Sequence, residues 1–67
     1  MTWQDLIKNN LHLFKEARRA WNLDELAIAY QIDNLANGTN HKDTGCGMCR
    51  RSVITRCRKL YESLPKD

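Results

Sequence analysis

The sequence predicts an all-α fold, a compact three-helix domain with a long polar loop between helices 2 and 3, from three observations. Apolar residues recur at steps of three and four in three segments, the periodicity of a helix with a buried face. Two of these segments open with residues typical of a helix start. No stretch alternates with the period of two that a half-buried strand shows. The 67 residues are expected to form a single domain over residues 1–67, with a small core.

The first helix is predicted over residues 3–20. Thr2 and Asp5 have the spacing of a capping box, in which each side chain accepts a backbone N–H that the helix leaves free. The predicted packing face comprises Trp3, Leu6, Ile7, Leu13, Phe14, Ala17 and Trp21.

The second helix is predicted over residues 23–36. Asn22 and Glu25 repeat the capping pattern, and Gly38 is the residue expected to end the helix in a left-handed conformation. Apolar residues lie on two sides of this helix, which is typical of a helix in the middle of a molecule or against a partner. One side carries Leu23, Leu26, Ala27 and Tyr30, and the other carries Ile28, Ile32, Leu35 and Ala36.

A polar loop is predicted over residues 37–45, followed by a last helix over 46–63. The pair Leu64-Pro65 ends that helix, because proline disfavours helical backbone in the residue before it. Cys57 lies among apolar neighbours and is expected in the core. The packing face of the last helix comprises Cys49, Val53, Ile54, Cys57, Leu60, Tyr61 and Leu64.

The positive charge is concentrated in the last third of the chain. The net charge is +3, with −1 over residues 1–44 and +4 over residues 45–67. This asymmetry makes nucleic acid a candidate partner, and an ordinary solvated helix face is the alternative. A helix-turn-helix is disfavoured because its turn has only about 3–4 residues. The candidate binding residues are Arg50, Arg51, Arg56, Arg58 and Lys59.

His41, Cys46 and Cys49 form the one pattern with metal-binding chemistry. Two thiolates separated by two residues, with a nearby histidine, are typical ligands of a structural zinc ion. Tetrahedral zinc needs a fourth ligand, which the sequence does not identify. Cys57 is too far along the helix, His12 lies on the polar side of the first helix, and Asp43 is a candidate because it is near in sequence. The alternative is that Cys46 and Cys49 are small apolar packing residues. A redox dithiol is a further alternative, although such sites follow a strand and none is predicted here.

Other classes of function are excluded by what the sequence lacks. No apolar run reaches the roughly 20 residues of a membrane span, and the first residues do not resemble a secretory signal, so an intracellular location is expected. Paired carboxylates, a phosphate-binding glycine loop and a nucleophile elbow are all missing, so the chain is expected not to be an enzyme.

Residues 26–61 resemble a group of small uncharacterised proteins of tailed bacteriophages. The resemblance lies in Leu26-Ala27-Ile28-Ala29-Tyr30-Gln31, a polar loop, and Thr44-Gly45-Cys46-Gly47-Met48-Cys49-Arg50-Arg51 before a basic helix. Those proteins show Tyr-Asn where this chain has Tyr30-Gln31, and serine where it has Met48. The resemblance implies a phage accessory protein in the cytoplasm of an infected bacterium or in the virion, and it implies no reaction.

We therefore expect a small interaction protein that docks on a larger host or viral protein. If the apolar surface is not all internal, the candidate apolar contacts are Leu11, Ile28, Ile32 and Leu35. The alternative is a nucleic-acid-binding module that uses the basic last helix, and a dithiol redox protein is a third hypothesis. The sequence does not decide whether the chain forms a homo-oligomer.

Overall fold

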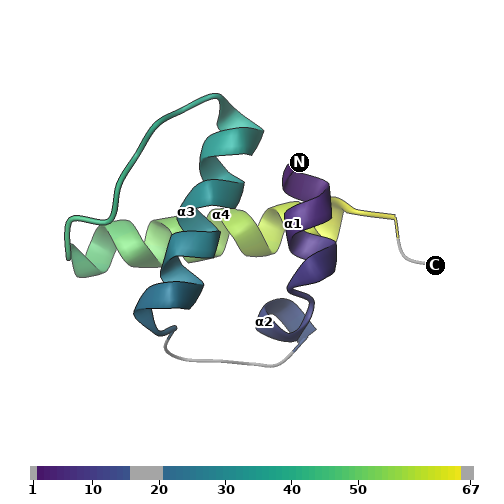
Figure 1. The fold of residues 1–67 in the computed structure, drawn as a ribbon, viewed down its shortest axis with the longest axis horizontal. Coiled ribbons are helices and arrows are strands. Elements are labelled where there is room, and N and C mark those ends of the chain that lie inside the picture. Colours follow the sequence, from purple (N-terminus) through teal and green to yellow (C-terminus); the bar gives the residue numbers. More distant parts are fainter. Residues whose placement is uncertain (1, 16–20, 66–67) are drawn as a thin grey trace.

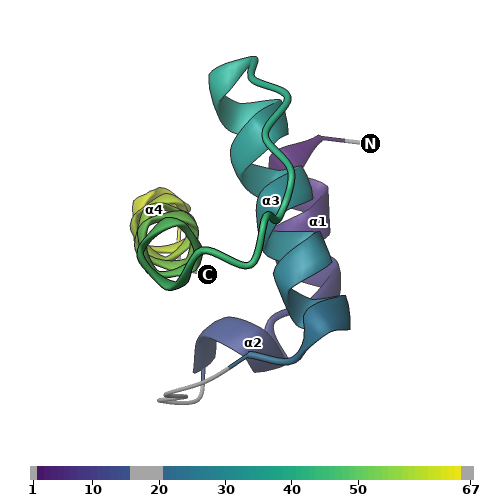
Figure 2. The same ribbon diagram turned by 90° about the vertical axis from the view of Figure 1, so that its left-hand side faces the viewer.

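The computed structural model describes residues 2–15 and 21–65, and all regular structure in these residues is helical. Four helices follow one another along the chain: α1 (Trp3–Asn9), α2 (His12–Lys15), α3 (Leu23–Asn37) and α4 (Gly47–Ser63). α1 and α3 lie alongside each other, and α4 crosses them (Figures 1 and 2). The all-α prediction is confirmed over the described residues. None of the helices in this part of the chain has the length and apolar character needed to cross a membrane.

The prediction of one continuous helix over residues 3–20 is wrong. α1 begins with the expected capping box of Thr2 and Asp5, but it ends at Asn9. The Asn10 side chain donates to the Leu6 carbonyl at 2.8 Å, and the Asn10 backbone N–H bonds the Ile7 carbonyl at 3.0 Å. These bonds terminate the helix, because an asparagine side chain offers the backbone an alternative to the helical pattern. Residues 16–20, including Ala17, lie outside the described residues.

The turn after α1 brings aromatic side chains together. α2 runs across the end of α1 rather than continuing it (Figure 1). Leu13 and Phe14 are thereby buried. The Phe14 ring meets the Trp21 ring edge to face, with ring centroids 5.7 Å apart. It also stacks on the Tyr61 ring of α4, with ring centroids 5.3 Å apart. Apolar packing with a distant helix therefore overrides the local tendency of this segment to continue as one helix.

α3 has the predicted caps and lies in the middle of the molecule. Asn22 and Glu25 form the capping box, and Gly38 ends the helix with φ of 65°. Both α1 and α4 pack against α3, and in the view of Figure 2 α4 lies beside α3 while α1 lies behind it. Ile32, one of the candidate apolar contacts, is fully buried in the core and is not available to a partner. Of the other apolar contact candidates, Leu35 is exposed, whereas Leu11 and Ile28 pack against the core.

α4 confirms the prediction for residues 46–63 to within one residue, with Cys46 as its N-cap. Val53 and Cys57 are fully buried in the core, as expected for Cys57. The predicted packing roles of the aromatic residues are confirmed as well, since Trp3 and Tyr61 pack against that core. The buried core comprises Leu6, Ile7, Leu13, Phe14, Trp21, Leu26, Ala29, Tyr30, Ile32, Val53 and Cys57.

Candidate binding site at the start of the last helix

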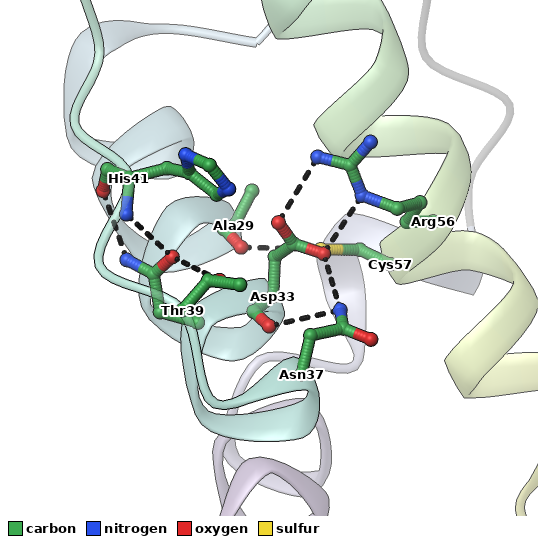
Figure 3. A network of polar contacts seen from close by, with 8 residues as sticks. Ala29, Asp33, Asn37, Thr39, His41, Arg56 and Cys57 are labelled. Atoms are coloured by element: carbon green, nitrogen blue, oxygen red, sulfur yellow. Dashed lines mark hydrogen bonds and ion pairs between the residues drawn. The ribbon is translucent and has the colours of Figure 1, made fainter.

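The loop between α3 and α4 arches away from the helices (Figure 1), and Asn34 holds its first half. The Asn34 Nδ2 donates to the His41 carbonyl, and Asn34 Oδ1 accepts the His41 backbone N–H, each at 2.9 Å. The Thr39 hydroxyl donates to the same Oδ1 at 2.9 Å (Figure 3). One side chain of α3 therefore sets the path of the loop as far as His41.

Asp43 fastens the second half of the loop to the first turn of α4. Its carboxylate accepts two bonds from the Arg50 guanidinium, each at 2.9 Å, and a third from the Gly45 backbone N–H at 3.0 Å. The Arg50 bonds, and then the Gly45 bond, hold the pKa of Asp43 below its ordinary value, because they favour the ionised carboxylate. Gly45 has φ of 83°, a left-handed conformation that suits glycine.

A buried carboxylate joins α3 to α4. Asp33 is 1% exposed and accepts Arg56 Nε at 2.9 Å and Arg56 Nη2 at 3.0 Å. Asn37 Nδ2 donates to the same carboxylate at 2.9 Å (Figure 3). The hydrogen bond that Arg56 donates to Asp33 raises the pKa of Arg56, which stays charged. These bonds offset the desolvation of Asp33, because a buried carboxylate is stable only with such partners.

The loop and the two helices enclose a hollow of about 450 Å³. This volume lies within the range of about 300–1,000 Å³ that is usual for ligand pockets. Lys42 and Arg56 supply cations to the wall, and no residue of the lining is acidic. The lining comprises Tyr30, His41, Lys42, Thr44, Met48, Cys49, Ser52, Val53 and Arg56.

Tyr30 carries an unsatisfied polar group at this hollow. The side chain is 6% exposed, and its hydroxyl has no hydrogen-bond partner among the described residues. Burial, reinforced by the nearby Asp43 charge, raises the pKa of Tyr30, so the hydroxyl keeps its proton and stays a donor. An unpaired buried hydroxyl costs about 1–3 kcal/mol. A ligand that supplied an acceptor would recover part of this free energy.

Cys46 and Cys49 lie exposed at the N-terminus of α4. Cys46 Sγ caps the helix by accepting the Cys49 backbone N–H at 3.4 Å. Interaction with the Cys49 side chain lowers the pKa of Cys46, and the same interaction raises that of Cys49. Because both cysteines are exposed, the alternative in which they are small apolar packing residues is wrong. The helix N-terminus and the Cys49 backbone N–H favour a thiolate at Cys46, because both present positive charge or a hydrogen-bond donor to its sulfur.

The predicted zinc ligands are only partly brought together. His41 and Cys49 line the hollow, while Cys46 is not part of its lining. No group of three or more His, Cys, Asp or Glu side chains within residues 2–15 and 21–65 is arranged to hold a metal ion. Zinc binding stays a prediction, tested by native mass spectrometry before and after chelation. A mass equal to that of the bare chain under gentle conditions would contradict it.

The five basic residues predicted to bind a partner have different roles. Arg50 and Arg56 form ion pairs with Asp43 and Asp33. Arg51 and Lys59 are exposed, and Arg58 is half-buried. The charges of Arg50 and Arg56 are therefore engaged within the chain and are less available to an anionic ligand.

Sequence reasoning missed Asp33, Asn34 and Lys42, and it considered Asp43 only as a metal ligand. Asp33 and Asn34 form a polar pair between Ile32 and Leu35, inside an otherwise apolar part of the helix, and this interruption was a usable signal. Lys42 and Asp43 lie in a polar loop, where their residue types are unremarkable and only the folded loop gives them partners.

The chemistry of this site has to be derived from its own residues. An apolar wall, two cations, an unsatisfied hydroxyl and an exposed thiol pair lie within one stretch of surface. Comparisons with protein-family models, with curated proteins and with solved structures found no match for this chain.

Proposed function

We propose that this chain is a small, non-enzymatic interaction protein that docks on an acidic segment of a larger protein through the hollow beside α4. The lining of the hollow carries the proposal, because it combines apolar side chains with cations and contains no acidic residue. Complementary charge selects such a partner, while apolar contact supplies affinity.

The apolar part of the hollow suits a small aliphatic side chain. Val53 and Tyr30 are buried and form a firm wall. Met48 is 80% exposed and lines the same hollow. A flexible thioether adapts to ligands of different shape, which is why methionine is common at binding surfaces of broad specificity.

The cationic part favours carboxylates. Lys42 is exposed and forms no ion pair with the described residues, so a ligand carboxylate reaches it without displacing an internal partner. Arg56 is already paired with Asp33, so Lys42 is the cation through which the lining selects a carboxylate. An acceptor oxygen placed against Tyr30 would supply the partner that its hydroxyl lacks.

The resemblance to tailed-phage proteins bears on where such a partner is found. Under this proposal, the acidic segment belongs to a host or viral protein inside an infected bacterium or in the virion. The location does not affect the chemistry of docking, which can be tested with a synthetic peptide.

The test uses a fluorescein-labelled peptide, Asp-Glu-Leu-Glu-Asp, and its uncharged twin, Asn-Gln-Leu-Gln-Asn. Fluorescence anisotropy should show saturable binding of the acidic peptide to the full chain, and binding of the twin should be at least about tenfold weaker, the loss of one good charge-assisted bond. Equal affinity for both peptides, or saturable binding of neither, would overturn the proposal.

Two matched pairs of variants locate the binding. Lys42→Glu should weaken the acidic peptide at least about tenfold, whereas Lys59→Glu changes the net charge equally but lies outside the hollow and should have a small effect. Met48→Ser should weaken binding more than Leu23→Ser, since both residues are exposed and only Met48 lines the hollow. Equal losses within either pair would show that the peptide binds elsewhere.

The nucleic-acid alternative is an outcome of the same experiment. A short labelled duplex DNA would bind with an affinity that falls steeply with salt, because neutralised phosphates release counterions. Binding of that kind, weakened by Arg51→Glu and unchanged by Met48→Ser, would favour the alternative and count against docking in the hollow.

A further inference from the structure

Two of the three cysteines touch each other at the start of α4. Cys46 Sγ accepts the Cys49 backbone N–H at 3.4 Å, so the two residues meet within one helical turn. Both side chains are exposed. A reactant in solution can therefore reach both sulfur atoms.

Cys57 provides an internal contrast. Its side chain is fully buried, and its thiol donates to the Ala29 carbonyl at 3.2 Å. No other cysteine is present in the chain. Cys57 is therefore expected to be inert under native conditions, because thiol chemistry requires access as well as ionisation.

We propose that Cys46 and Cys49 form a thiol–disulfide exchange site whose substrates are small disulfides such as glutathione disulfide. The Cys46 thiolate attacks one sulfur of the substrate, the substrate disulfide breaks, and one glutathione leaves as a thiolate. Cys49 then loses its proton and attacks Cys46 Sγ. The Cys46–Cys49 bond forms as the second glutathione leaves. Two electrons pass from the cysteine pair to the substrate, and the two protons released by the pair balance the two thiols formed.

The order of attack follows from the position of each sulfur. Cys46 is the N-cap of a 17-residue helix, and its sulfur already accepts a backbone N–H there, so negative charge is stabilised on it. Cys49 lies one turn further on, and its backbone N–H is the donor to Cys46 Sγ. Cys49 is therefore placed to resolve a mixed disulfide on Cys46, and the site works once per chain unless it is reduced again.

Intact-mass spectrometry of the full chain after exposure to glutathione disulfide tests the site. The product of the unmodified chain should be lighter by two hydrogen atoms and carry no glutathione. Cys49→Ser should trap one glutathione on Cys46, because the resolving thiol is gone. Cys46→Ser should react at least about tenfold more slowly than Cys49→Ser, since the remaining thiol lacks the cap position.

Thiol counting with N-ethylmaleimide keeps the test independent of any variant. The oxidised chain should take up no N-ethylmaleimide while folded. After unfolding it should take up one equivalent, on Cys57. Persistent glutathione on the unmodified chain, equal rates for the two serine variants, or a disulfide that includes Cys57 would each overturn the proposal. This inference does not depend on docking in the hollow, so either can fail alone.

Discussion

The two ends of α4 are held to the rest of the molecule by different forces. The later part of the helix packs Cys57 into the core and lays Leu60 and Tyr61 against it. The first turn exposes Met48 and Cys49, and Arg50 ties it to Asp43 of the loop. Apolar burial secures one end, and directional polar bonds secure the other.

The difference in force implies a difference in local stability. Burying one large aliphatic side chain contributes about 1.5–3 kcal/mol. An exposed ion pair contributes about 0–1 kcal/mol. The start of α4 and its loop should therefore open more readily than the rest of the helix, which leaves the hollow and the thiol pair able to adjust to a ligand.

Removing buried apolar volume should have the largest effect. Ile32→Ala deletes a fully buried side chain from α3 and should lower the free energy of unfolding by about 2–5 kcal/mol. Leu35→Ala in the same helix is the control, because Leu35 is 48% exposed, and its effect should stay below about 1 kcal/mol. Urea unfolding followed by tryptophan fluorescence measures both. Similar losses would show that the core does not dominate stability.

Breaking the buried ion pair comes next. Arg56→Met leaves the Asp33 carboxylate buried with Asn37 as its remaining side-chain donor, and should cost about 1–3 kcal/mol. Arg50→Met breaks the exposed pair with Asp43 and should cost less. The same urea titration distinguishes the two variants. If Arg50→Met lowered the free energy of unfolding more than Arg56→Met, the exposed ion pair would contribute more than the pair with the buried Asp33 carboxylate.

The buried thiol should make stability sensitive to alkaline pH. Burial raises the pKa of Cys57 from 9.0 to about 12. Between these values the unfolded chain releases a proton that the folded chain keeps. The free energy of unfolding therefore falls as pH rises, by about 1.4 kcal/mol per pH unit from this group.

Cys57→Ala isolates that contribution from other groups that titrate in the same range, including Tyr30. The variant should be about 1–2 kcal/mol less stable at neutral pH, through its lost volume and its lost bond to Ala29. Its stability should also fall less steeply above pH 9.0 than that of the unmodified chain. Parallel pH profiles for the two proteins would contradict the buried, protonated thiol.

Glycine substitutions at the ends of the loop should have the smallest effect on stability. Gly38 has φ of 65°, so Gly38→Ala should cost about 1 kcal/mol although the space beside it is open. Gly47 lies at the start of α4 without a positive φ and with equally open space. Gly47→Ala should be neutral or stabilise by up to about 1 kcal/mol. Thermal unfolding of the two variants shows whether each substitution raises or lowers stability. A stabilising effect of Gly38→Ala would contradict the prediction.

Local signals in the sequence account for most of the helix boundaries. The capping boxes at Thr2 and Asn22 and the left-handed stop at Gly38 depend on residues a few positions apart, so the sequence alone identified them. The end of α1 was missed because the apolar periodicity continues through Asn10, while the side chain of that residue closes the helix.

The sequence by itself determined the helical class, the caps, the burial of Cys57 and the pairing of Cys46 with Cys49 in one turn. Tertiary structure alone decided that Asp33 meets Arg56 across 23 positions, that the Asn34 side chain holds the loop, and that Tyr30 and Lys42 line one hollow. The physical reason is distance along the chain. Caps and turns are local hydrogen-bond patterns, whereas an ion pair between helices or a cavity wall exists only after packing has fixed which faces meet.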